Sequence, residues 1–107
     1  MRKSSNGYRN KQGQNLMMSE QAETIALQAL AFLVKDENLL THFLATSGLT
    51  PEDLKTRFRE PELLGGVLDA ILANDSVLLS FCNTMSLSPE TLVIARRALP
   101  GANEIMN

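Results

Sequence analysis

From Ser19 to Pro100 the hydrophobic residues recur every three or four positions in short segments. This is the spacing of residues that share one face of an α-helix. Polar residues suited to helix starts, together with Gly and Pro, separate the segments. The pattern predicts an all-α fold, a compact bundle of about six short helices. The helices are expected to begin at Ser19, Asp36, Thr50, Glu60, Asp75 and Ser88.

The same start signals recur along the chain. Thr50 and Ser88 can accept hydrogen bonds as N-caps, and a proline follows each at the first helical position, where its missing N–H costs nothing. Gly48 is expected to end the second helix, because glycine readily adopts the left-handed conformation found there. Further N-caps are predicted at Ser19, Asp36 and Asp75.

The apolar faces of the predicted helices differ in width. The first helix is hydrophobic nearly all round over residues 25–34, which favours a central, buried position and hides which face is exposed. The fourth helix has a narrower stripe, formed by Leu64, Val67, Leu68, Ile71 and Leu72. The fifth helix is expected to bury one side, formed by Leu78, Phe81, Cys82 and Met85.

Two stretches of the chain match each other in order and identity. Residues 31–40 match 70–79 with a shift of 39, and residues 43–54 match 81–92 with a shift of 38, giving eleven identities in 22 positions. We interpret this as an internal duplication, with two related three-helix units that fill one another's apolar sides. Glycine in a helix interior costs about 1 kcal/mol relative to alanine, so Gly65 should have a compensating structural role. We expect that Gly65 and its counterpart Ala26 let the first and fourth helices approach closely.

Charge is divided unevenly along the 107 residues. Residues 1–15 carry four basic side chains and no acidic one, whereas the remainder carries six basic and twelve acidic side chains. The organisation predicted is a disordered basic tail at 1–18, a helical domain at 19–101 and a flexible C-terminus at 102–107. Ten of the acids fall at predicted caps or early turns, where the helix dipole favours them, and only Asp69 and Glu104 do not.

Residues capable of catalysis or metal binding are few. His42 has no orienting carboxylate or nucleophile suggested by the sequence, and we expect an ordinary, partly exposed histidine. Cys82 shares an apolar face and is expected to be an inert core thiol. One Cys and one His fall short of a zinc site. The sequence therefore predicts no enzyme and no cofactor.

Location follows from the lack of targeting features. The longest apolar run, at residues 25–34, is about half the ~20 residues that a membrane helix needs. No apolar segment follows the basic N-terminus, as a secretory signal requires. We expect a cytoplasmic protein that does not bind a membrane.

Two functional classes remain. The preferred one is a non-enzymatic protein–protein interaction module, because a core of this size leaves apolar surface for an unidentified protein partner or for self-association. The alternative is a helix-turn-helix-like nucleic-acid-binding protein, with the turn near residues 86–92. A net charge of −6 after residue 15 opposes it, because phosphate binding needs a positive face. The contact residues of this alternative would be Arg57, Arg59, Arg96 and Arg97.

Three runs carry a family resemblance: residues 23–33, residues 43–54 and residues 95–101, the last reading Ala-Arg-Arg-Ala-Leu-Pro-Gly. In combination they resemble a family of short, uncharacterised helical proteins from alphaproteobacteria, catalogued as a domain of unknown function. The resemblance spans about residues 19–101. It implies a cytoplasmic bacterial protein and implies no activity, because the family has no assigned activity or site residues.

Overall fold

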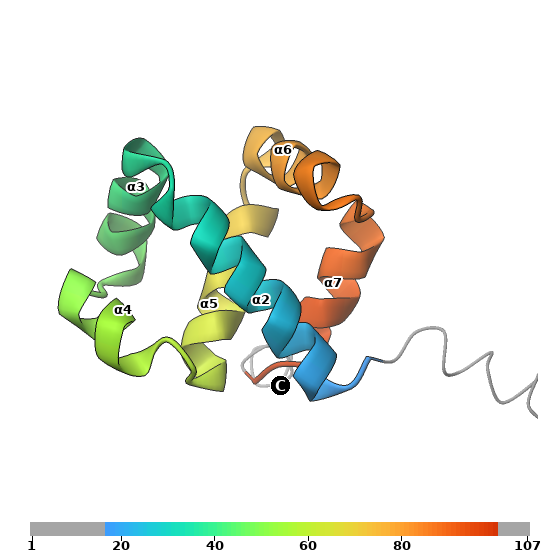
Figure 1. Cartoon of the computed structure of the whole chain (residues 1–107), viewed down its shortest axis with the longest axis horizontal. Helices are drawn as coiled ribbons and strands as arrows, with labels where there is room; N and C mark the ends of the chain where they lie inside the picture. The colour runs from blue at the N-terminus through green and yellow to red at the C-terminus, as the bar shows by residue number, and fades with distance from the viewer. Residues whose placement is uncertain (1–16, 101–107) are drawn as a thin grey trace, which may run out of the picture.

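The computed structural model describes residues 17–100 as six α-helices joined by short connections (Figure 1). No strand occurs within these residues, which confirms the predicted all-α fold. The predicted tail lies outside the described residues except for Met17 and Met18, and Met17 packs against the core. The predicted flexible end at 102–107 also lies outside them. The helices are α2 (Ser19–Val34), α3 (Glu37–Ser47), α4 (Pro51–Arg57), α5 (Pro61–Leu72), α6 (Asp75–Met85) and α7 (Pro89–Arg97).

Helices α2 and α5 cross at the centre of the molecule and supply most of its buried hydrophobic side chains (Figure 1). Ala22, Ala26 and Ala29 of α2 have no exposed surface, and their short side chains allow a close approach. The apolar stripe predicted for α5 is confirmed except at Leu72, which is only half-buried. α7 packs against both central helices, while α3 contacts α2 and α5, and α6 contacts α5 and α7.

Three of the predicted N-caps are confirmed. The side chains of Asp36, Thr50 and Ser88 each accept a hydrogen bond from a backbone N–H two or three residues later. These bonds satisfy N–H groups that the first turn of a helix leaves without partners. Gly48 ends α3 with a φ of 79°, the left-handed conformation predicted for it.

The N-caps predicted at Ser19 and Asp75 are wrong by one residue. α2 is capped by Met18 and α6 by Asn74, whose side-chain oxygen accepts the N–H of Val77 at 3.2 Å. Met18 and Asn74 have the extended backbone of an N-cap, with ψ values of 147° and 107°. Because the chain becomes helical immediately after them, Ser19 and Asp75 are first helical residues.

The two predicted units correspond in several of their helix ends. With a shift of 38, the N-caps of α3 and α4 and the left-handed residue that ends α3 fall on their counterparts in the second unit, whereas the N-caps of α2 and α5, Met18 and Glu60, are 42 positions apart. The sequence match placed residues 36–40 at a shift of 39, but the N-cap of α6 lies 38 positions after the N-cap of α3. The one-residue gap between the two units therefore lies before these caps. The internal duplication itself stays a prediction. The corresponding residues are Asp36 and Asn74, Gly48 and Ser86, and Thr50 and Ser88.

The last helices of the two units are placed differently. α7 buries Leu92, Ala95 and Arg96 and packs on both central helices. α4 has no buried residue and lies away from the centre (Figure 1). The second unit therefore closes over the core, whereas the first leaves an apolar side of α2 partly uncovered.

A buried arginine holds α7 in place. Arg96 is 8% exposed, and its Nε and Nη2 donate to the two carboxylate oxygens of Asp69 on α5 at 2.7 and 3.1 Å. Its Nη1 donates to the backbone carbonyls of Leu99 and Pro100 at 3.3 and 2.9 Å. The guanidinium is thus bonded on all its nitrogens, as a buried charge requires.

Gly65 makes room for this arginine. A Cβ at position 65 would lie 3.0 Å from Nη1 of Arg96 and 3.1 Å from the carbonyl oxygen of Pro100. The neighbour predicted for Gly65, the first helix, is therefore wrong. The close approach of α2 to α5 depends on the alanines of α2, and Gly65 serves the contact with α7.

Replacing Gly65 by leucine should lower the free energy of unfolding by about 1–3 kcal/mol, because the side chain overpacks the Arg96 site. Gly66→Leu is the matched control in the same helix, since a Cβ at Gly66 meets no atom within 4 Å. The control should be as stable as the wild type or more so, because leucine is the better helix former. Urea unfolding followed by circular dichroism measures both, and equal stability of the two variants would contradict the assignment.

Ser86 and Gly48 both have the left-handed backbone conformation, and exchanging their side chains tests what that conformation costs. Ser86 ends α6 with a φ of 57°, a region that is unfavourable for side chains with a Cβ. Ser86→Gly should therefore raise the unfolding free energy by up to about 1 kcal/mol. Gly48→Ser should lower it by a similar amount, although a Cβ there meets nothing within 4 Å. Thermal unfolding of both variants should give shifts of opposite sign; shifts of the same sign would refute this explanation.

Candidate partner-binding groove

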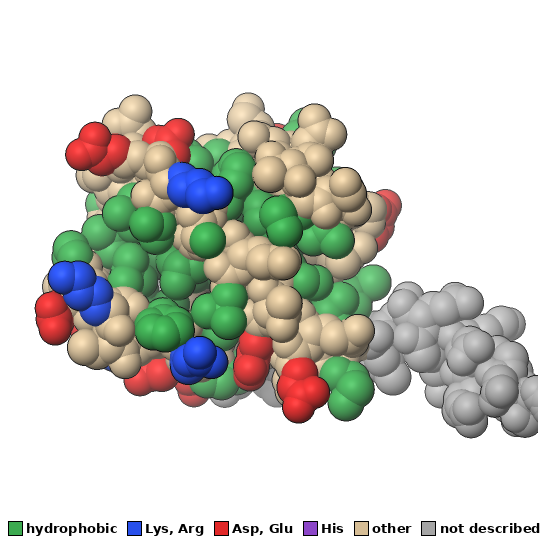
Figure 2. All heavy atoms as spheres, in the orientation of Figure 1, with side chains coloured by type: hydrophobic (Ala, Val, Ile, Leu, Met, Phe, Trp, Pro, Cys, Tyr) green, Lys and Arg blue, Asp and Glu red, His purple; other side chains and the backbone are tan. Residues whose placement is uncertain are grey.

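An apolar groove lies between α2, α3 and α4. Its volume is about 470 Å³. Figure 2 shows hydrophobic side chains gathered in this hollow, in the part of the surface where α4 stands away from α2. The groove is lined by Leu27, Leu30, Ala31, Val34, Leu40, Pro51, Leu54, Lys55 and Phe58.

The floor of the groove is the side of α2 that the core does not use. Leu27, Ala31 and Val34 are spaced four and three residues apart and so share one face. Val34 is 50% exposed, although a valine side chain prefers burial. Because the predicted first helix is hydrophobic all round, its sequence alone did not show which side would remain open.

The outer wall is α4, and local interactions determine where this helix begins and ends. The Thr50 hydroxyl accepts the N–H of Asp53 at 3.1 Å, and the Asp53 carboxylate accepts the N–H of Thr50 at 3.0 Å. This reciprocal capping starts the helix at Pro51. At its other end Arg57 pairs with Glu60 at 2.9 Å. Both interactions are within or beside α4, so they stabilise the helix without tying it to the core.

The four arginines of the nucleic-acid alternative are not equally available. Arg96 is buried and paired with Asp69, and Arg57 pairs with Glu60 and, at 3.7 Å, with Asp53. A pair of this kind neutralises the charge that a phosphate would need. The guanidinium of Arg59 lies over the ring of Phe58, 5.2 Å from its centroid. Arg97 is exposed at the end of α7.

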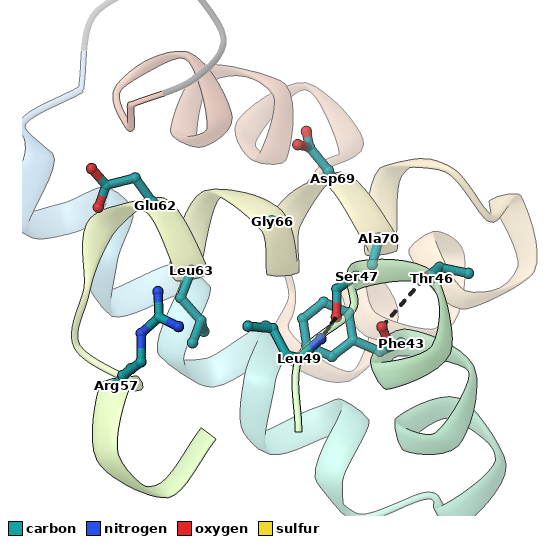
Figure 3. A pocket seen from close by; sticks show the side chains of 10 residues that line it. All are labelled: Phe43, Thr46, Ser47, Leu49, Arg57, Glu62, Leu63, Gly66, Asp69 and Ala70. Atoms are coloured by element: carbon teal, nitrogen blue, oxygen red, sulfur yellow. Dashed lines mark hydrogen bonds between the residues drawn. The ribbon is translucent and has the colours of Figure 1, made fainter. Parts of the chain in front are cut away.

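A second hollow, also of about 470 Å³, lies between α3, α4 and α5 (Figure 3). Gly66 opens it, and the lining includes the charged side chains of Arg57, Glu62 and Asp69. The two hydroxyls on its α3 side have local partners: Thr46 donates to backbone carbonyls of its own helix, and Ser47 accepts the N–H of Leu49. Asp69 is engaged by Arg96. The geometry therefore brings no nucleophile and base together here.

His42 and Cys82 occupy ordinary positions. His42 is exposed on α3, and nothing in its position departs from the ordinary histidine that was expected. Cys82 is 5% exposed, which confirms its predicted burial. Burial raises the pKa of the Cys82 thiol, and the charge of Glu90 adds to this. Within residues 17–100 no group of three or more His, Cys, Asp and Glu could hold a metal ion.

Within residues 17–100 no single helix is long and apolar enough to cross a membrane. α5 and α6 reach that length and apolarity only together, and they are bent by 108° where they meet.

The fold and the groove define a small all-α domain with an apolar hollow between three of its helices. Residues 19–102 match the family described as "Protein of unknown function (DUF3572)", and the chain belongs to this family. The match confirms the resemblance to a domain of unknown function, while the bacterial group stays a prediction. Comparison with curated proteins and with solved structures found no match.

The cap of α4 should make the groove sensitive to acid. The hydrogen bond from the Thr50 backbone lowers the pKa of Asp53, and the charge of Arg57 acts in the same direction. A lowered pKa means that Asp53 stabilises α4 fully above its ordinary pKa of about 4 and loses this effect as the pH falls through the lowered value. The protection of the α4 amides, measured by NMR as their exchange rate relative to the intrinsic rate at the same pH, should fall over that range. Asp53→Ala should show low protection at every pH; protection that does not change with pH in the wild type would contradict the capping role.

Proposed function

We propose that this protein is a non-enzymatic interaction module that binds a protein partner in the groove between α2, α3 and α4. The supporting observation is that three helices expose apolar side chains in one hollow, with Val34 half exposed and Leu54 and Phe58 only partly buried. Burial of such surface is the main favourable contribution to most protein association. We also propose the cytoplasmic location expected from the sequence.

Nucleic-acid binding remains the alternative, with weaker support. Two of its four candidate arginines are engaged in ion pairs, and the charge after residue 15 is strongly acidic. An apolar hollow is suited to a protein partner rather than to the phosphate backbone, which is recognised through positive charge.

The experiment is a pull-down with the full-length tagged protein from a native lysate of the source organism, with and without nuclease. Val34→Gln removes apolar surface from the groove without changing the charge. Leu79→Gln is the matched control, because Leu79 on α6 is 60% exposed and lies outside the groove. Circular dichroism should show both variants folded.

We expect one stoichiometric protein partner that survives nuclease treatment. Its recovery should fall by about fivefold with Val34→Gln, the effect of losing about 1 kcal/mol of apolar burial, and stay unchanged with Leu79→Gln. Recovery that disappears with nuclease would favour the alternative. Equal loss with both variants, or loss with neither, would argue against the groove as the binding surface.

A further inference from the structure

The groove has the dimensions and chemistry of a site for a helix. Its floor on α2 runs from Leu27 to Val34, seven residues or roughly 10 Å at the rise of an α-helix. That length matches about two turns of a bound helix, whose apolar residues recur at the same spacing. A partner in strand form would need a sheet edge to pair with, and residues 17–100 contain no strand.

Three of the six basic residues within 17–100 line the groove or directly follow a residue that lines it. Lys55 lines it, Lys35 directly follows the lining residue Val34, and Arg59 stacks on the lining residue Phe58. None of these three side chains forms an ion pair within residues 17–100. Of the other basic residues within 17–100, Arg57 and Arg96 form ion pairs. Arg97 is the remaining basic residue without an ion pair in this range, and it does not line the groove.

In the described part of the chain no acidic side chain lines the groove, whereas Lys55 does; the acids of this region lie at the starts of α3 and α4. Asp36 and Asp53 are held in the capping bonds of α3 and α4. Glu37 and Glu52 lie in the first turns of the same helices. Figure 2 shows basic side chains at the margin of the hydrophobic hollow, with acidic side chains beside two of them and farther out on the same face. Among the described residues, the lining of the groove thus contains one base and no acid, and two further bases, Lys35 and Arg59, directly follow lining residues.

We propose that the partner is an amphipathic helix whose apolar face is flanked by Asp and Glu side chains. This inference rests on the proposed interaction function and adds the chemistry of the partner. The apolar residues of such a helix would fill the hollow, and its acids would face Lys35, Lys55 and Arg59. The chain's own segment 1–15 has the wrong charge for the site, since it carries four basic residues and no acid.

The test uses two labelled synthetic peptides of 14 residues with the same leucines on one helical face. One carries glutamates beside the leucines and the other carries lysines. Fluorescence anisotropy measures their binding to the full-length protein, to the charge-reversed variants Lys55→Glu and Arg59→Glu, and to the double variant. Arg97→Glu is the matched control, because Arg97 is exposed and does not line the groove.

The acidic peptide should bind more tightly than the basic one, and each reversal at the groove should weaken it by about two- to fivefold, as exposed ion pairs do. The double variant should lose roughly tenfold or more and prefer the basic peptide, whereas Arg97→Glu should change little. Equal binding of the two peptides, abolished by Val34→Gln, would overturn the acidic partner and leave the groove as a docking site. Binding of neither peptide would also overturn the inference, and the lysate experiment would decide the proposed function separately.

The alternative occupant of the groove is a second copy of the chain, and the oligomeric state of the protein alone tests for it. Sedimentation velocity of the protein alone should give a monomer at micromolar concentration. A dimer that Val34→Gln converts to a monomer would show that the groove is filled by self-association, and this would overturn the inference of an acidic helix.

Discussion

The placement of the second unit depends on one buried guanidinium. Removing the charge of Arg96 from water is unfavourable unless its donors are bonded, and the structure provides Asp69 and two backbone carbonyls for this purpose. Those partners come from α5 and from the chain immediately after α7. The bonds therefore fix both the rotation of α7 and the path of the following residues, so that Leu92 and Ala95 face the core.

In the first unit, the positions that correspond to Asp69 and Arg96 hold apolar side chains. This difference explains why the first unit leaves a groove open. With the shifts that relate the two units, Asp69 corresponds to Leu30 and Arg96 corresponds to Phe58. Leu30 and Phe58 both line the groove. Where the second unit has a directional polar contact, the first has two apolar side chains, and apolar contacts do not fix an orientation. α4 consequently has no buried residue, while α7 has three.

Helix starts and ends could be predicted from the sequence more accurately than contacts between residues far apart in the chain. The caps at Asp36, Thr50 and Ser88 were predictable because a cap bond spans only two or three residues. The error at Asp75 arose because Asn74 can cap equally well, and the backbone angles decide between neighbours. Gly65 was assigned the wrong neighbour because its partner, Arg96, is 31 positions away. Asp69 stood out as an acid away from any helix start, which was the available sign of a distant partner. The groove had no comparable sign, because α2 is apolar on all sides.

α4 is a wall shared by two hollows. Leu54 and Phe58 face the apolar groove, while Arg57, at the end of the same helix, lines the hollow between α3, α4 and α5. A rigid displacement of α4 toward α2 must enlarge the second hollow as it narrows the first. Since no side chain of α4 is buried, such a displacement exposes little of the core, and regions of this kind open at low free energy. The shapes of the two cavities are therefore linked through a single short helix.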